Sequence, residues 1–127
     1  MNPTFLTLDE VLEIHRDQVA RYGGSHGVRD LGLLQSALAQ PQATFGGKFL
    51  HADIFEMASA YLFHIVVNHP FIDGNKRVGA VAALVFLLIN NQDIAATNAE
   101  LETLVLSVAQ GQIGKTEIAE FLRNHAI

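Results

Sequence analysis

The stretch His69-Pro70-Phe71-Ile72-Asp73-Gly74-Asn75-Lys76-Arg77 runs directly into an apolar segment, residues 78–89. Because proline disfavours the helical conformation in the residue before it, we expect a helix to end at His69. The segment that follows is apolar on nearly all sides, so other helices must enclose it. The stretch therefore predicts two helices joined by a short turn, with the second at the centre of a helical domain.

Further helices are predicted on both sides of this pair. The first begins at Thr7, whose hydroxyl can form a capping box with Glu10, and it ends at Gly23 and Gly24. Its acidic residues, Asp9, Glu10, Glu13 and Asp17, are expected on a solvated face. Its apolar positions, Leu8, Val11, Leu12, Ile14, Val19 and Tyr22, are expected to face the core. The other predicted helices are residues 30–39, 53–68, 75–91, 98–110 and 116–125.

Two details of this pattern bear on the fold. In the second helix, Leu31, Leu34, Ala37 and Leu38 are expected to point inward before Pro41 ends the segment. Residues 41–50 contain paired glycines and two phenylalanines, which predict a short hairpin or flap. Phe45 and Phe49 fit either ordinary core positions or a flap that aligns a target.

The whole chain, residues 1–127, has the size of one domain, and 50% of its residues are hydrophobic. We see no internal repeat, low-complexity segment or linker. The predicted fold class is all-α, a single-domain bundle of about six helices around a buried central helix.

Charge and composition exclude several classes of function. A net charge of -5, with the cations scattered, argues against a nucleic-acid-binding surface. The apolar segment at 78–89 is shorter than the ~20 residues that a membrane-spanning helix needs. The chain has no cysteine, which excludes disulfides and fits a reducing compartment. We therefore expect a soluble cytoplasmic protein.

The motif concentrates the chemistry of the chain. Asp73 is a hard oxygen ligand of the kind that Mg²⁺ binds together with phosphate oxygens. Gly74 permits a turn whose N–H groups form an anion nest. Asn75 can donate through its amide, and Arg77 can bind phosphate with its planar guanidinium. These residues predict a phosphate-binding site at the start of a helix.

His69 is the candidate base beside that site. Phosphoryl transfer needs a group that accepts the proton of the attacking hydroxyl, and a neutral imidazole can do so near pH 7. Lys76 and Arg77 are the only adjacent cations of this acidic chain, which indicates a local anionic ligand. Structural roles remain open for two of the motif's residues: Asp73 as a helix cap and Lys76 as a solvated side chain.

Other residues have simpler interpretations. Phe71 is expected to be a core anchor that fixes the loop. His64 lies five residues before His69, which is unsuitable spacing for a shared metal site. The remaining histidines, His15, His26, His51 and His125, are expected at the surface or facing a partner.

Residues 69–77 resemble the Fic signature HPFx(D/E)GN(G/K)R, and the NKR ending is similar to the death-on-curing (Doc) branch, the toxins of toxin–antitoxin pairs. Residues 21–24, residues 33–41 and the apolar segment after the motif also resemble that branch. The resemblance implies the Fic/Doc fold and transfer of a phosphorus-containing group from a nucleotide to a hydroxyl of a target protein. Fic proteins commonly transfer AMP, whereas the Doc type acts as a kinase on elongation factor Tu.

Carried over by position, the resemblance makes His69 the base and Asp73 the Mg²⁺ ligand. The phosphates of ATP would be held by Gly74, Asn75, Lys76 and Arg77, and residues 41–50 would form the flap that aligns the target. Members that inhibit themselves carry an (S/T)xxxE(G/N) helix, but no glutamate of this chain is followed by Gly or Asn. An antitoxin acting in trans is therefore expected.

Two departures from the AMP-transferring pattern favour the kinase. Lys76 replaces a glycine, and Ala80 stands where a second arginine is expected. AMP transfer is the alternative, and a non-catalytic module that binds a nucleotide or a partner is the alternative of another class. A metal-dependent phosphohydrolase is a weaker fourth option, because the motif has a single carboxylate and no paired histidines.

Overall fold

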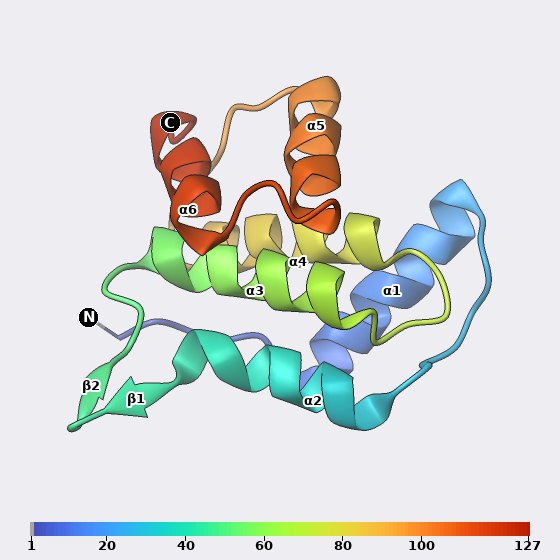
Figure 1. The fold of residues 1–127 in the computed structure, drawn as a ribbon, viewed down its shortest axis with the longest axis horizontal. Helices are drawn as coiled ribbons and strands as arrows, with labels where there is room; N and C mark the ends of the chain where they lie inside the picture. Colours follow the sequence, from blue (N-terminus) through green and yellow to red (C-terminus); the bar gives the residue numbers. More distant parts are fainter. Residues whose placement is uncertain (1) are drawn as a thin grey trace.

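The computed structural model describes residues 2–127 and is dominated by helices (Figure 1). The elements are α1 (Leu8–Tyr22), α2 (Leu31–Ala39), the 3-10 turn η1 (Gln40–Gln42), β1 (Thr44–Phe45), β2 (Lys48–Phe49), α3 (Ile54–Asn68), α4 (Asn75–Ile89), α5 (Asn98–Ala109) and α6 (Lys115–Asn124). The prediction of an all-α bundle is confirmed. Its helix boundaries agree with the expected ones to within two residues.

Local hydrogen bonds explain where the helices begin. The Thr7 hydroxyl accepts from the Glu10 N–H at 3.2 Å, and the Thr7 N–H donates to the Glu10 carboxylate at 2.8 Å. This is the capping box that the sequence predicts. Asp30 and Asp53 cap α2 and α3 without a reciprocal bond: one side-chain oxygen of each accepts from a backbone N–H of the first turn.

Helix α3 lies at the centre of the bundle. It runs beside α4, with α2 on one side and the α5–α6 pair on the other (Figure 1). Gly79 of α4 allows the two central helices to approach closely, because an added Cβ would lie 2.8 Å from the Val66 side chain and 3.2 Å from the Leu62 carbonyl. This close crossing brings the end of α3 and the start of α4 together at one end of the bundle.

Enclosure of α4 is less complete than its sequence suggests. Leu88 is 59% exposed and Ile89 is 41% exposed, although seven of its residues are buried. Eight residues of α3 are buried, and α3 packs on more elements than α4 does. The sequence predicts that the apolar helix after the motif, α4, lies at the centre of the bundle. In the structure α3 and α4 are both central, and α3 is the more buried of the two.

Most of the predicted core is confirmed, but two positions are wrong. Phe71 is 1% exposed, and the acidic residues of α1 lie on the surface, both as expected. Tyr22 is 66% exposed and Leu31 is 49% exposed, although both were expected to point inward. Tyr22 is the last residue of α1 and Leu31 is the first residue of α2, so each lies at an end of its helix.

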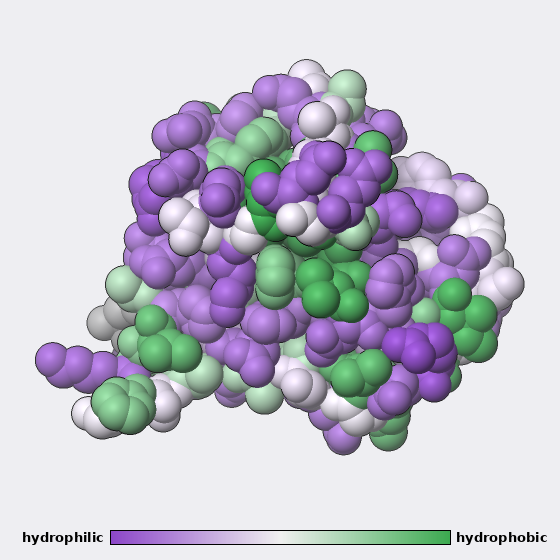
Figure 2. Space-filling view, in the orientation of Figure 1, coloured by the Kyte–Doolittle hydropathy of each residue, from purple (hydrophilic) through white to green (hydrophobic). Residues whose placement is uncertain are grey.

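The predicted hairpin is present and protrudes from the bundle (Figure 1). Thr44 pairs with Phe49 and Phe45 with Lys48. The two aromatic side chains differ: Phe49 packs on Phe5, with ring centroids 5.7 Å apart, whereas Phe45 is 82% exposed. Apolar residues are visible on this protruding hairpin at the lower left of Figure 2.

Across residues 2–127, the structure has no helix with the length and apolar character that crossing a membrane requires.

Candidate active site

His69 occupies the C-cap of α3 in a left-handed conformation, with φ 49° and ψ 53°. The helix ends there because Pro70 follows, as the sequence predicts. The histidine is exposed to solvent, so its imidazole is accessible to a second molecule. A residue other than glycine in this conformation needs surrounding contacts to hold it.

The side chain of Asn75 fixes the loop between the two helices. Its Oδ1 accepts from the Phe71 N–H at 2.9 Å, and its Nδ2 donates to the Phe71 carbonyl at 3.0 Å. Asn75 is 6% exposed. Its amide is thus engaged with the loop, whereas its backbone N–H donates to no other described residue.

The second hydrogen of the Asn75 amide faces the ring of His69. Its Nδ2 lies 3.4 Å from Nδ1 of His69, which is long for a hydrogen bond. The contact suits a ring whose proton is on Nε2. A histidine acting as a base through Nε2 would carry its proton on Nδ1 and would lose this contact.

His15 supports the loop from α1. Its ring stacks on Phe71 with centroids 4.0 Å apart and an interplanar angle of 6°, and Nε2 lies 3.0 Å from the Asp73 carbonyl oxygen. With Nε2 protonated, this is a hydrogen bond that fixes the main chain at Asp73. His15 is 3% exposed, so the expectation that it lies at the surface is wrong. Its place between Val11 and Val19, at intervals of four residues, is the signal that could have identified it.

Asp73 lies at the surface with both oxygens oriented by backbone N–H groups. Oδ1 accepts from Gly74 at 2.9 Å and Oδ2 accepts from Ser25 at 3.2 Å. Gly24 makes this approach possible, because a Cβ there would lie 2.8 Å from Oδ2. The loop after α1 is therefore a part of the site that the motif alone does not reveal.

The candidate site offers Mg²⁺ one side-chain ligand, the carboxylate of Asp73. No group of three or more His, Cys, Asp or Glu side chains suited to a metal occurs in the part of the chain that the structure describes. A carboxylate oxygen has lone pairs beyond the one that a backbone N–H uses. Asp73 can therefore hold a magnesium ion whose other ligands are phosphate oxygens and water.

The start of α4 presents free donors. Gly74 is its N-cap, with φ 80° and no side-chain cap. The N–H groups of Asn75, Lys76 and Arg77 donate to no other residue of the described chain. A helix start carries partial positive charge, so these N–H groups are donors available to an anionic ligand.

The two cations of the motif lie on the surface beside these donors. Arg77 stacks its guanidinium 5.4 Å from the centre of the Tyr22 ring, and its Nη1 lies 3.4 Å from the Gln18 carbonyl. This contact places the exposed ring of Tyr22 beside the first turn of α4. Among residues 2–127 neither Lys76 nor Arg77 has a carboxylate partner, so both charges remain available to a ligand.

Two other predicted features lie elsewhere. The hairpin of residues 44–49 precedes the start of α3, whereas His69 follows its end, so the length of the helix, about 22 Å, separates them. In Figure 1 the hairpin lies near the first turn of α3, at the opposite end of that helix from the loop that leads into α4. His51 is 7% exposed, so the expectation that it lies at the surface is also wrong.

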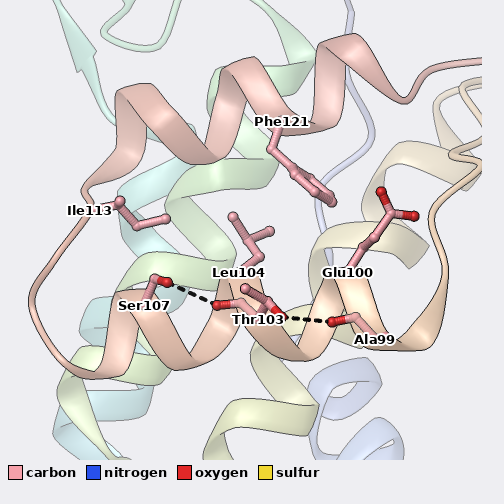
Figure 3. Close-up of a pocket in the computed structure, with 7 residues that line it drawn as sticks. All are labelled: Ala99, Glu100, Thr103, Leu104, Ser107, Ile113 and Phe121. Atoms are coloured by element: carbon pink, nitrogen blue, oxygen red, sulfur yellow. Dashed lines mark hydrogen bonds between the residues drawn. The ribbon is translucent and has the colours of Figure 1, made fainter.

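An open apolar hollow of about 440 Å³ lies between α5 and α6, away from the motif (Figure 3). Its lining residues are Ala99, Glu100, Thr103, Leu104, Ser107, Ile113 and Phe121. The Glu100 carboxylate pairs with His125 at 2.9 Å. The backbone carbonyl of Phe121 and this carboxylate raise the pKa of His125. None of residues 69–77 lines this hollow, so the candidate site is the exposed surface at the start of α4.

Comparison with known proteins agrees with this geometry. The sequence model of the Fic/DOC family matches residues 5–87. "Toxin Doc" of Mycolicibacterium smegmatis is 44% identical over 75 residues, which cover 59% of this chain and 58% of the toxin. "Protein kinase doc" of Escherichia phage P1 is 31% identical over 115 residues, which cover 91% of this chain and 90% of the phage protein. The chain therefore spans little more than half of the first relative and nearly all of the second. It belongs to the Fic/DOC family, within the Doc branch.

Proposed function

We propose that this protein is a toxin that transfers a phosphate from ATP to a Ser or Thr hydroxyl of a target protein. The observation that carries the proposal is the arrangement around residues 69–77. An exposed histidine at the end of α3 has its ring 3.4 Å from the side-chain amide of Asn75, the first residue of α4, and the first three N–H groups of α4 have no partner in the described chain. A phosphate and a proton acceptor can thus occupy neighbouring positions.

Backbone and side-chain donors would share the binding of the phosphates. The N–H groups of residues 75–77 suit the oxygens of one phosphate, and the charges of Lys76 and Arg77 suit the rest of the triphosphate. Asp73 would hold Mg²⁺, which neutralises phosphate charge when bound. Gly74 contributes the turn that opens the helix start.

His69 would accept the proton of the attacking hydroxyl. Its exposure lets a protein substrate approach, and Asn75 orients the loop that carries it. Phosphoryl transfer depends mainly on positioning and charge neutralisation, so one base beside an anion-binding site would be enough for this reaction.

Two residues support phosphate transfer over AMP transfer. Lys76 is an exposed cation in the first turn of α4, and Ala80, one turn later, offers no second guanidinium. The relative from phage P1 is itself named a protein kinase. We take elongation factor Tu as the target and the cytoplasm as the place of action, with restraint by an antitoxin that binds this chain in trans.

Labelled nucleotides test the proposal. Purified protein is incubated with elongation factor Tu, Mg²⁺ and ATP labelled at either the γ or the α phosphate, and the modified peptide is weighed by mass spectrometry. We expect γ label on the target, and none with His69→Ala. Transfer of α label would replace the kinase with an AMP transferase. Growth inhibition that persists in the His69→Ala variant without any label would favour the binding module.

A further inference from the structure

Residues 27–30 form hydrogen bonds with the main chain at the end of α3 and in the loop that follows it. The backbone N–H groups of Arg29 and Asp30 both donate to the Pro70 carbonyl, at 2.7 and 3.0 Å. The Gly27 carbonyl accepts from the Ile72 N–H at 3.1 Å. Residues 27–30 therefore run against the main chain of the loop that carries His69.

The side chain of Arg29 completes this arrangement. Its Nε donates to the His69 carbonyl at 2.6 Å, and its Nη2 donates to the Asn68 carbonyl at 2.9 Å. A planar guanidinium can bind two neighbouring carbonyls at once, which an ammonium cannot do with the same geometry. A cation is also favourable at the C-terminus of a helix, where the carbonyls carry partial negative charge.

The residue held in this way is the one with the unusual backbone. His69 and Asn91 are the residues other than glycine with positive φ in the described chain, and His69 is the one at the candidate site. Fixing the Asn68 and His69 carbonyls fixes the orientation of the two peptide groups that set the φ and ψ of His69. The direction of its Cα–Cβ bond, and hence the position of the imidazole beside α4, follows from that orientation.

We propose that Arg29 is a positioning residue for His69, acting through main-chain carbonyls and touching no reacting atom. This inference rests on the function proposed above. It assigns a catalytic consequence to a residue outside residues 69–77, on the chain between α1 and α2. Without the guanidinium, His69 is expected to leave the left-handed conformation part of the time, and its imidazole moves away from the phosphate site.

Three variants separate positioning from simple stabilisation. Arg29→Ala removes both hydrogen bonds, and Arg29→Lys keeps the charge at the helix end but loses the two-carbonyl geometry. Arg16→Ala is the matched control, because Arg16 is an exposed arginine of α1 whose guanidinium pairs with Glu13 at 2.7 Å and not with the main chain at the end of α3. Each is assayed for kcat, for the KM of ATP and for thermal unfolding.

We expect kcat to fall about 10- to 100-fold in Arg29→Ala, with the KM of ATP changed less than about threefold, because a base displaced by about 1 Å loses rate without loss of nucleotide binding. Arg29→Lys should unfold close to the wild-type temperature while keeping a large part of the kcat defect. Arg16→Ala should match the wild type in both parameters. A kcat within about twofold of wild type in Arg29→Ala, measured where the variant is folded, would overturn the proposal.

A second readout does not depend on the reaction. Backbone NMR shifts and couplings of His69 report its φ in the wild type and the variants. Positive φ should persist in the wild type and in Arg16→Ala, and should be partly lost in both Arg29 variants. If the wild type transfers no phosphate but these shifts change as expected, the proposed function fails and positioning stands; unchanged shifts with an active wild type reject positioning alone.

Discussion

Two histidines from the same helix have opposite surroundings. His69, at the end of α3, is exposed, and its main chain is held by Arg29 while Asn75 lies beside its ring. His64, one turn and a half earlier, is half-buried, with the Lys115 ammonium 3.3 Å from its Nε2 and the Phe63 ring 5.1 Å away. Burial and then the charge of Lys115 lower the pKa of His64 to about 4.

The contrast extends to the neighbours of each histidine. At the candidate site, the Asn75 side chain forms hydrogen bonds with the loop, and the first N–H groups of α4 have no partner in the described chain. Around His64, the chain buries His51, whose Nδ1 has no hydrogen-bond partner among the described residues. The surroundings of His69 leave its ring exposed, whereas the contact of His64 with Lys115 joins α3 to α6. Both residues are histidines and both belong to α3 or its C-cap, so the tertiary environment decides whether each imidazole is accessible or buried.

The largest effect that would test this contrast is on catalysis. His69→Ala should lower the transfer rate by 10²- to 10⁴-fold, the usual contribution of a general base, with little change in unfolding temperature. Because alanine tolerates positive φ poorly, His69→Asn serves as a second variant that keeps the backbone. His64→Gln is the control and should retain most of the activity. Equal losses of transfer rate in the His64 and His69 variants would contradict the different roles assigned to the two histidines.

A smaller effect concerns the buried amide of the loop. Asn75→Asp keeps an acceptor for the Phe71 N–H but removes the donor to the Phe71 carbonyl and buries a charge. We expect a loss of about 3 kcal/mol in the free energy of unfolding, measured with urea at pH 7. Asn98→Asp, at the exposed first turn of α5, changes charge equally and should be neutral or slightly stabilising. A neutral Asn75→Asp would mean that the loop does not depend on this amide.

The approach of the α1 loop to Asp73 gives a third, still smaller effect. Gly23 and Gly24 both have positive φ, but only at Gly24 would a Cβ meet the Asp73 carboxylate. We expect Gly23→Ala to lower the free energy of unfolding by about 1 kcal/mol, from backbone strain alone, and Gly24→Ala by roughly 2–3 kcal/mol. Gly24→Ala should also raise the Mg²⁺ concentration needed for half-maximal activity. Indistinguishable variants would show that the carboxylate moves freely.

The pH dependence of stability should report the buried histidines. Burial first, and then the charge of Lys115, also lowers the pKa of His51, although Glu56 opposes the shift. Both groups have their ordinary pKa near 6.5 when the chain is unfolded. The unfolded state therefore binds more protons as the pH falls from about 6.5 toward 4, and the folded state loses stability across that window.

Urea unfolding at several pH values measures this loss. His64→Gln should make the free energy of unfolding less dependent on pH between pH 6.5 and 4. His26→Gln, at an exposed residue, should leave the pH dependence of the free energy of unfolding unchanged. A wild-type curve that is flat over this window would contradict burial of the two histidines.

Much of this molecule follows from short-range sequence signals. The capping box at Thr7 and Glu10, the end of α3 before Pro70, and the hairpin around Gly46 and Gly47 all come from residues within a few positions of one another. Backbone sterics and local hydrogen bonds act over that range, so the sequence determined these elements directly. It also determined the chemical groups of residues 69–77.

Only the tertiary structure decided which distant residues join those groups. His15, Gly24 and Arg29 reach the loop from α1 and from the chain that follows it, more than 30 residues away in sequence. Tertiary packing likewise buried His51 and left Tyr22 exposed beside Arg77. Such contacts depend on how helices pack, and a side chain's burial is the outcome of that packing, which no local pattern specifies.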